Sequence, residues 1–229
     1  MSMDGFKEEL KGWIVEFSQR YCADRGVEPI WREPLVGLAD AESPMFPELK
    51  VIAHPSHKVP QDYLPGAKTV VSYFLPFRPA IPDNNAGGRL PTKEWAEAYK
   101  LTNSMAKDLS RHIAERIIEK GHRAVAPEDF TQIIDRTYSC WSQRHVARIA
   151  GLGNFGINCM LITDSGCGGR FFSVVTDMPC EHDAPDLRER CLYKIDGSCG
   201  RCARACIVGA VSGEGFDRDA CEDQCNSNI

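Results

Sequence analysis

The chain has 229 residues, a net charge of −5 and a hydrophobic share of 43%. These values suit one medium-sized domain with a small second module, and the acidic balance excludes a general attraction to nucleic-acid phosphate. The first residues, MSMDGFKEELKGW, lack the apolar stretch of a secretory signal, and no apolar run is long enough for a membrane span. We therefore expect a cytoplasmic protein whose eleven cysteines serve metals or catalysis rather than disulfides.

The spacing of apolar residues predicts the first elements of a core. Residues 4–25 repeat apolar side chains every three or four positions, which predicts an amphipathic helix. Residues 35–39 are a short apolar strand candidate, and residues 68–75 are β-branched and aromatic and predict the clearest strand. The proline-rich residues 41–66 and the segment 79–91 predict loops.

The middle of the chain predicts two further helices. The first is long, with Thr92 as its N-cap and Gly121 at its end. Residues 123–134 then predict a strand and a loop. Residues 139–150 predict a second helix, which Gly151 stops.

Two strands are expected to close the core. Residues 158–163 and 170–176 predict a hairpin with the glycine-rich loop 164–169. The predicted fold class is therefore α+β, with a largely antiparallel sheet flanked by helices over residues 1–178. Residues 179–229 are predicted to form a separate, small cysteine module.

The cysteine module has the spacing of an iron–sulfur site. The run Cys199-x2-Cys202-x3-Cys206 brings three thiolates within about two turns of backbone, as a cubane cluster requires. The bacterial ferredoxin run is C-x2-C-x2-C-x3-C-P, and here Asp196 stands at its first cysteine position and Ile207 at its proline. Cys191, eight residues before Cys199, can loop back to replace the missing ligand, and the fourth ligand is then expected from Cys206, Cys221 or Cys225. The candidate ligands of the 4Fe–4S cluster are Cys191, Cys199, Cys202, Cys206, Cys221 and Cys225.

A structural zinc site and a disulfide framework explain these cysteines less well than a cluster does. A structural zinc site usually needs two separated cysteine pairs, whereas the chain has a single CxxC, and a disulfide framework needs an oxidising compartment. Two clusters would need eight ligands, which Cys167 and Cys180 could complete. One cluster is therefore expected, with a second as an open alternative. Cys22, Cys140 and Cys159 are most simply small buried hydrophobic residues.

Gly151, Gly153 and Gly156 form a literal GxGxxG pattern. A dinucleotide-binding fingerprint needs a strand before the pattern and a helix after it, and here the predicted order is the reverse. The glycines are better explained by a close approach of the backbone to a flat ligand or to a neighbouring strand.

The chain resembles a known family in this region. Three stretches of the chain are similar to epoxyqueuosine reductases, and in particular to the short members of anaerobes. They are the run from Trp141-Ser-Gln-Arg-His145 to Gly156-Ile-Asn, the segment Gly169-Arg-Phe-Phe-Ser-Val-Val-Thr-Asp177, and the pattern Gly-Ser-Cys199-Gly-x-Cys. The specific resemblance covers about residues 130–225. It implies a cobalamin-binding, nitroreductase-like domain and a ferredoxin-like module, and an enzyme that reduces an epoxide in a tRNA-bound queuosine precursor. The C-terminal repeat domain and the second cysteine motif of full-length members have no counterpart here, which leaves tRNA as an uncertain substrate.

The resemblance also implies roles for single residues. Asp135 matches a proton-donating aspartate, and the backbone at the three glycines would lie near the corrin ring. Cys199 and Cys202 match ligands of one cluster, whereas Cys206 and Cys221 match ligands of the other.

The residues themselves suggest further site candidates. His145 could donate a hydrogen bond to a cofactor edge or act as an acid, and Arg144 and Arg170 could bind anionic groups of a cofactor. His54 and His57, in the proline-rich segment, are better explained as solvated loop residues than as pocket residues.

Two functions of different classes are compatible with these patterns. The first is a reductase, in which the cluster passes electrons to a cobalamin-type cofactor, or to a flavin, and a ferredoxin or flavodoxin supplies them. Its substrate would be a small molecule or a modified nucleoside. The second is a non-catalytic electron carrier that docks redox partners. The size of the core favours the reductase.

Overall fold

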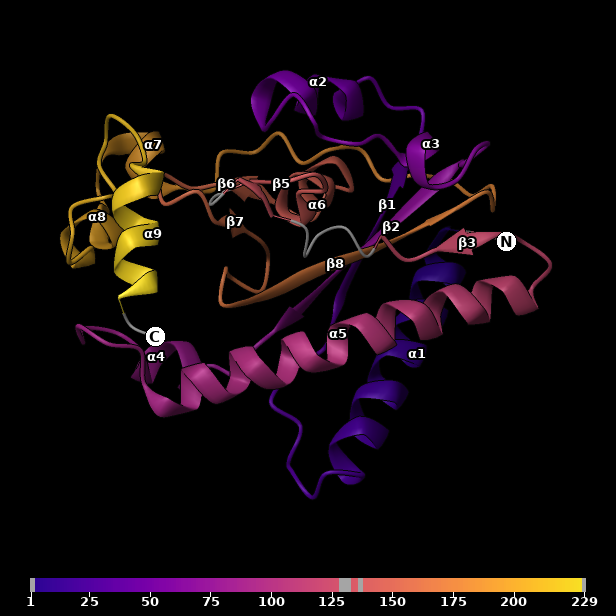
Figure 1. Cartoon of the computed structure of the whole chain (residues 1–229), viewed down its shortest axis with the longest axis horizontal. Coiled ribbons are helices and arrows are strands. Elements are labelled where there is room, and N and C mark those ends of the chain that lie inside the picture. The colour runs from indigo at the N-terminus through magenta and orange to yellow at the C-terminus, as the bar shows by residue number, and fades with distance from the viewer. Residues whose placement is uncertain (1–2, 128–132, 136–137, 228–229) are drawn as a thin grey trace.

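Two long segments rich in β-branched and aromatic residues form the central pair of strands in the fold (Figure 1). The structure is a computed structural model that describes residues 3–127, 133–135 and 138–227. The described strands are β1 (Leu35–Asp40), β2 (Thr69–Pro76), β3 (Ala124–Val125), β4 (Ile133–Asp135), β5 (Tyr138–Ser139), β6 (Asn154–Phe155), β7 (Leu161–Ile162) and β8 (Gly169–Thr176). The described helices are α1 (Met3–Ala23), α2 (Met45–Ile52), α3 (Pro60–Tyr63), α4 (Ala80–Asn84), α5 (Lys93–Glu119), α6 (Gln143–Ile149), α7 (Leu192–Asp196), α8 (Arg201–Ala205) and α9 (Arg218–Asn226).

The main sheet is antiparallel and has the strand order β1-β2-β8-β3. In its centre Ser72 lies opposite Ser173, and Tyr73 lies opposite Phe172. Every residue of β2 is buried, because helices cover both faces of the sheet. The mixture of helices and an antiparallel sheet confirms the predicted α+β class.

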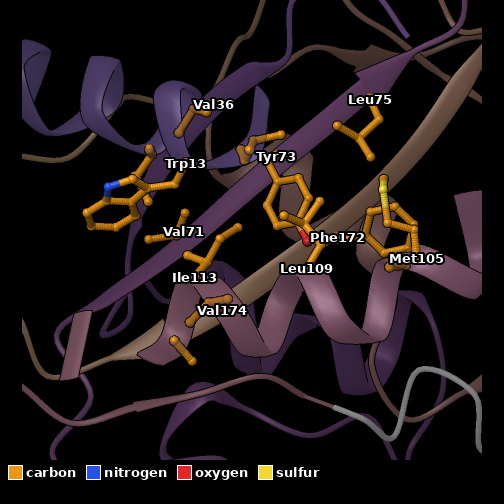
Figure 2. Close-up of a cluster of buried hydrophobic side chains, with 14 of the residues drawn as sticks. Trp13, Val36, Val71, Tyr73, Leu75, Met105, Leu109, Ile113, Phe172 and Val174 are labelled. Carbon is orange, nitrogen blue, oxygen red and sulfur yellow. The ribbon is translucent and has the colours of Figure 1, made fainter. Parts of the chain in front are cut away.

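Helices α1 and α5 cover one face of the sheet. Side chains of alternate residues on β2 and β8 point to this face and meet α5, as Figure 2 shows for Tyr73, Phe172 and Leu109. The hydroxyl groups of Tyr73 and Ser110 share a hydrogen bond of 2.7 Å, so that the buried phenol has a partner. Helix α5 begins after Thr92, whose side chain accepts from the Trp95 N–H at 3.3 Å, as the sequence predicts.

The opposite face packs against α2 and α6. Trp141, just before α6, is fully buried and stacks on Phe46 of α2 with ring centroids 6.0 Å apart. Its indole N–H donates to Ser173 Oγ of β8 at 2.9 Å. These contacts fix the start of α6 over the centre of the sheet, where the cavities described below lie.

Three predictions of local structure are wrong in part. The proline-rich residues 41–66 contain α2 and α3, and residues 79–91 contain α4. The helix expected over 139–150 is the shorter α6, because Ser139 belongs to β5.

The predicted hairpin of residues 158–163 with 170–176 is also wrong. β7 pairs with β6, whereas β8 pairs with β2 and β3. The central partner of β8 therefore lies far away in the sequence, and the loop between β7 and β8 connects two different sheets.

The residues after β8 return along the edge of the sheet before they form the cysteine module. Asp183 N–H donates to the carbonyl of Leu38 in β1 at 2.7 Å, and a carboxylate oxygen of Asp183 accepts from the Leu38 N–H at 2.8 Å. Helices α7, α8 and α9 then lie at one end of the molecule, on the side of β6 and β7 (Figure 1). Within the described part of the chain, every helix is too short or too polar to cross a bilayer.

Candidate metal centre and adjoining cavities

Short helices position the cysteines of the module. Cys191 precedes α7 and is 8% exposed, Cys202 lies in α8, and Cys221 and Cys225 lie one turn apart in α9. Gly200, just before α8, has a φ of 87°, which glycine adopts without strain. The chain can therefore turn sharply between α7 and α8.

The thiols form two groups. The first thiol group is Cys191, Cys199 and Cys202, and the second thiol group is Cys206, Cys221 and Cys225. Burial raises the pKa of Cys202, and the nearby thiols of Cys191 and Cys199 raise it further. Burial likewise raises the pKa of Cys221, with further contributions from Cys225 and Cys206. The mutual effect within each group shows that its thiols lie close together.

The surroundings of these sulfur atoms fit metal-bound thiolates. Burial alone would raise the pKa of Cys191, but the N–H groups of Ile157, Lys194 and Tyr193 outweigh it and lower the pKa. At Cys206 the N–H groups of residues 208–211 outweigh burial in the same way. The thiolate is the ligating form, and hydrogen bonds to cluster sulfurs are one means by which proteins tune a cluster. The donor set therefore fits an iron–sulfur cluster.

Among the described His, Cys, Asp and Glu side chains, no three lie close enough together to hold a single metal ion. The thiolates of a cubane cluster surround four irons rather than one, so they stand farther apart than the ligands of one ion.

Arg144 of α6 is a half-buried cation next to the module. Its guanidinium donates to the carbonyl oxygen of Cys159 at 2.5 Å and contacts Met160 Sδ at 3.5 Å. Burial lowers the pKa of Arg144, and the nearby cations Arg218 and Arg170 lower it further. Within the described residues no carboxylate pairs with this guanidinium, so the site favours an anionic or strongly polar ligand.

His145 follows Arg144 in α6 and is neutral near pH 7. Its pKa is lowered to about 4, first by burial and then by the positive charge of Arg144. Nδ1 shares a hydrogen bond of 2.7 Å with Ser142 Oγ, and the ring packs on Phe155 at 4.8 Å. A neutral imidazole can donate a hydrogen bond, but it has no spare proton to act as an acid at this pH.

Two cavities adjoin Arg144. The first has a volume of about 340 Å³ and lies between α6 and the module, with Lys194 and Arg218 on the module side. The second, of about 320 Å³, lies between α6 and β8. Gln143 lines the second cavity, and its Nε2 is buried without a partner among the described residues. An unsatisfied buried donor is costly, so this atom indicates a ligand that carries an acceptor oxygen.

The other predicted polar residues lie near these cavities or outside the described side chains. Arg170 of β8 lines the second cavity and its guanidinium lies 4.6 Å from the ring centroid of Tyr99. Asp135 ends β4, where its backbone pairs with that of Tyr138. The side chain of Asp135 lies outside the described part of the chain.

The three glycines pack against the chain itself. A Cβ on Gly153 would lie 2.2 Å from the carbonyl oxygen of Ile162, and one on Gly151 would lie 2.6 Å from that of Ala184. Gly156 lines the first cavity, and a Cβ there would lie 2.9 Å from the side chain of Asn158. The expected close approach to neighbouring backbone is therefore present at Gly151 and Gly153.

Two polar residues were not recognised from the sequence. His57 is 1% exposed rather than solvated, and its Nε2 accepts from the Ser142 N–H at 2.9 Å at the start of α6. Gln143 belongs to a chain of hydrogen bonds in which Trp141 donates to Ser173, and Ser173 donates to Gln143 Oε1 at 2.9 Å. Neither position carries a sequence motif, because both roles depend on contacts between distant segments.

Comparison with known proteins finds similarity at the level of structure. No protein-family model matches the chain, and no curated protein matches its sequence. An epoxyqueuosine reductase in complex with an epoxyqueuosine-modified tRNA-Tyr stem loop superposes with a TM-score of 0.52 and 19% identity, over 92% of this chain and 55% of that one. The epoxyqueuosine reductase of Streptococcus thermophilus gives a TM-score of 0.51 and 18% identity, over 90% and 54%.

Reductive dehalogenases share the same core. The catabolic dehalogenase NpRdhA, in complex with 3-bromo-4-hydroxybenzoic acid, superposes with a TM-score of 0.58 and 17% identity, over 82% of this chain and 26% of that one. A second such structure is described in terms of B12-dependent dehalogenation and gives a TM-score of 0.56. The predicted resemblance is thus confirmed at the level of the fold: this chain has the fold of the epoxyqueuosine reductases, over about half of their length.

Proposed function

We propose that the chain is an iron–sulfur reductase. A 4Fe–4S cluster in a ferredoxin-like module of residues 179–229 would pass electrons to a cobalamin-type cofactor or substrate in a nitroreductase-like core of residues 1–178. The observation that carries this proposal is the position of Arg144. This residue lines both cavities, and its positive charge favours the thiolate form of Cys221 in the second thiol group by lowering its pKa. One side chain therefore links the thiols of the module to the cavity over the sheet.

The residues of the second cavity, which has a volume of about 320 Å³, suit a polar portion of a cofactor rather than a whole corrinoid. Gln143 Nε2 offers a donor without a partner among the described residues, and Arg144 and Arg170 offer positive charge. A corrinoid, when bound, supplies a metal that accepts single electrons and can reduce a poorly activated substrate. A flavin is the alternative occupant, and its carbonyl oxygens would suit the same donor.

Protons have two candidate sources. Asp135 is proposed as the proton donor because of the family resemblance, and a carboxylic acid in this role needs burial to raise its pKa. His145 is proposed to orient the ligand as a neutral hydrogen-bond donor, because its pKa of about 4 leaves it uncharged at pH 7.

The substrate and the electron donor are proposals as well. A similar structure holds a modified tRNA stem loop and another holds a bromophenol, so a modified nucleoside or a small aromatic molecule is the proposed substrate class. A net charge of −5 makes intact tRNA the weaker candidate. A ferredoxin or flavodoxin in the cytoplasm is the proposed electron donor.

Anaerobic titration tests the proposal. Protein reconstituted with iron and sulfide is titrated with cobalamin and, separately, with flavin mononucleotide, and binding is followed by absorption. Gln143→Leu removes the unsatisfied donor and is expected to weaken binding about tenfold, the effect of one lost hydrogen bond. Gln19→Leu makes the same change on the exposed face of α1 and is the matched control. If a cluster forms but neither cofactor binds, the reductase proposal fails and the chain is better described as an electron carrier.

A further inference from the structure

The first thiol group lacks one ligand. A cubane cluster is held by four thiolates, and this group contains Cys191, Cys199 and Cys202. Asp196 stands where a ferredoxin has its first cysteine, but its carboxylate accepts a hydrogen bond of 2.9 Å from the Ser198 N–H and faces solvent. The module alone therefore leaves the cluster one thiolate short.

The loop between β7 and β8 holds a further cysteine in a fixed place. Thr163 and Gly166 exchange two backbone hydrogen bonds, of 3.1 and 3.0 Å. On the other side of Cys167, the carbonyl of Gly168 accepts from the Phe77 N–H at 2.9 Å. Cys167 is thus held between two anchored residues, and it is half-buried.

An ion pair ties this loop to the start of the module. Arg190 directly precedes Cys191, and its guanidinium lies 2.7 Å from Asp164 Oδ1 in the loop. The same guanidinium lies 2.6 Å from the buried carboxylate of Asp186. Because Asp164 is three residues before Cys167, the pair holds the loop against the backbone that carries the first thiol group.

The electrostatics of the thiols agree with the placement that this ion pair gives. Burial raises the pKa of Cys167, and the thiol of Cys202 raises it further, since two neighbouring thiolates repel each other. A metal that binds both sulfur atoms removes this repulsion, because each ligand is then a neutralised thiolate.

We propose that Cys167 is the fourth ligand of the cluster in the first thiol group, so that the core and the module hold this cluster jointly. This inference rests on the proposed iron–sulfur function. In this assignment Cys167 is the fourth ligand in place of Cys206, Cys221 or Cys225. Those three thiols then remain a separate group. It also explains why residues 163–168 are so closely bonded, since a loop ligand must be rigid to hold a metal in place.

The test compares three alanine variants after anaerobic reconstitution. Cys167→Ala and Cys199→Ala each remove a ligand, whereas Cys22→Ala removes a thiol that is buried in the hydrophobic core around α1. The measurements are iron and sulfide per chain, the EPR spectrum of the reduced protein, and alkylation of each cysteine mapped by mass spectrometry. Circular dichroism of the metal-free variants verifies that each one folds.

We expect Cys167→Ala to lose about as much iron as Cys199→Ala, or to give the EPR spectrum of a three-iron cluster, while Cys22→Ala matches the wild type. In the wild type, Cys167 is expected to resist alkylation when iron is bound and to react when iron is removed. If Cys167→Ala keeps the iron content and EPR spectrum of the wild type, the ligand assignment is wrong but the iron–sulfur function stands. If the wild type itself forms no cluster, the proposed function fails as well.

Discussion

Arg144 donates a hydrogen bond of 2.5 Å to the backbone carbonyl of Cys159, which is the one non-glycine residue with a positive φ in the described part of the chain. The φ of Cys159 is 56°, in the left-handed region that costs an L-residue about 1–2 kcal/mol. The half-buried guanidinium is therefore held by a carbonyl that a strained residue turns toward it.

This strain predicts an unusual order of stability at position 159. Cys159→Gly is expected to be more stable than Cys159→Ala by roughly 1 kcal/mol, because glycine adopts a positive φ without a steric penalty. Urea unfolding of the two metal-free variants measures the difference. An alanine variant that is as stable as the glycine variant would show that the left-handed conformation carries no cost.

The low pKa of His145 predicts a loss of stability in acid. The folded pKa is about 4, whereas an unfolded histidine has a pKa near 6.5, so the unfolded chain binds a proton first as the pH falls. The free energy of unfolding should therefore decrease from about pH 6.5 down to about pH 4, by up to roughly 3 kcal/mol. His145→Gln should lack this part of the decrease, as measured by urea unfolding of metal-free protein at several pH values. Burial also lowers the pKa of His57, so the free energy of unfolding of the variant should still depend on pH, but less steeply.

The charge of Arg144 is the second cause of the low pKa of His145 and can be tested on its own. Arg144→Gln is expected to raise this pKa, because it removes a neighbouring positive charge. NMR titration of the imidazole protons reports the value directly. Arg148→Gln is the control and should raise the pKa less, since Arg148 contributes less than Arg144 does. An equal response to both changes would argue against the close placement of Arg144 and His145.

Two glycines should respond to alanine in opposite ways. Gly12 lies inside α1 with open space around it, so Gly12→Ala should stabilise the protein by roughly 0.5–1 kcal/mol. Gly153→Ala would place a Cβ 2.2 Å from the carbonyl of Ile162 and should destabilise it by about 1–3 kcal/mol. Thermal unfolding of both variants decides the matter. A stabilising Gly153→Ala would contradict the close packing of β6 and β7, and a destabilising Gly12→Ala would contradict the open space around Gly12.

Metal removal should affect the two parts of the chain unequally. Metal binding supplies much of the folding free energy of a small module, and α7, α8 and α9 have no fully buried side chains of their own. In metal-free protein we expect residues 180–229 to exchange amide hydrogens rapidly. The amides of β2 and β8 should stay protected, because helices cover both faces of the sheet. Equal loss of protection in both parts would mean that the module and the core unfold together.

Local patterns predicted the elements whose causes are local. The capping hydroxyl of Thr92 and the regular apolar spacing after it lie within the sequence of α5, and the β-branched runs of β2 and β8 are equally plain. Proline misled the prediction at α2, because Pro44 and Pro47 lie at its N-cap and in its first turn, where the backbone N–H is not needed for the helix.

The contacts that make the site are between distant segments, and spacing does not reveal them. The six module cysteines stand in one region of the sequence, but their division into two groups depends on how α7, α8 and α9 lie in space. The unsatisfied amide of Gln143 depends on Trp141 and Ser173, which meet across the sheet. The role of Cys167 depends on Arg190, which follows it by more than twenty residues.

The bonding of Asp183 to Leu38 has a consequence for how separate copies of the chain behave. β1 is the edge strand of the main sheet, and Asp183 occupies both backbone groups of Leu38, where another strand could otherwise add. Asp183 lies in the segment that leads to the thiols, so loosening of that segment without metal would uncover an apolar edge. We therefore expect the metal-free protein to self-associate along β1, so that a bound metal would also keep the protein monodisperse.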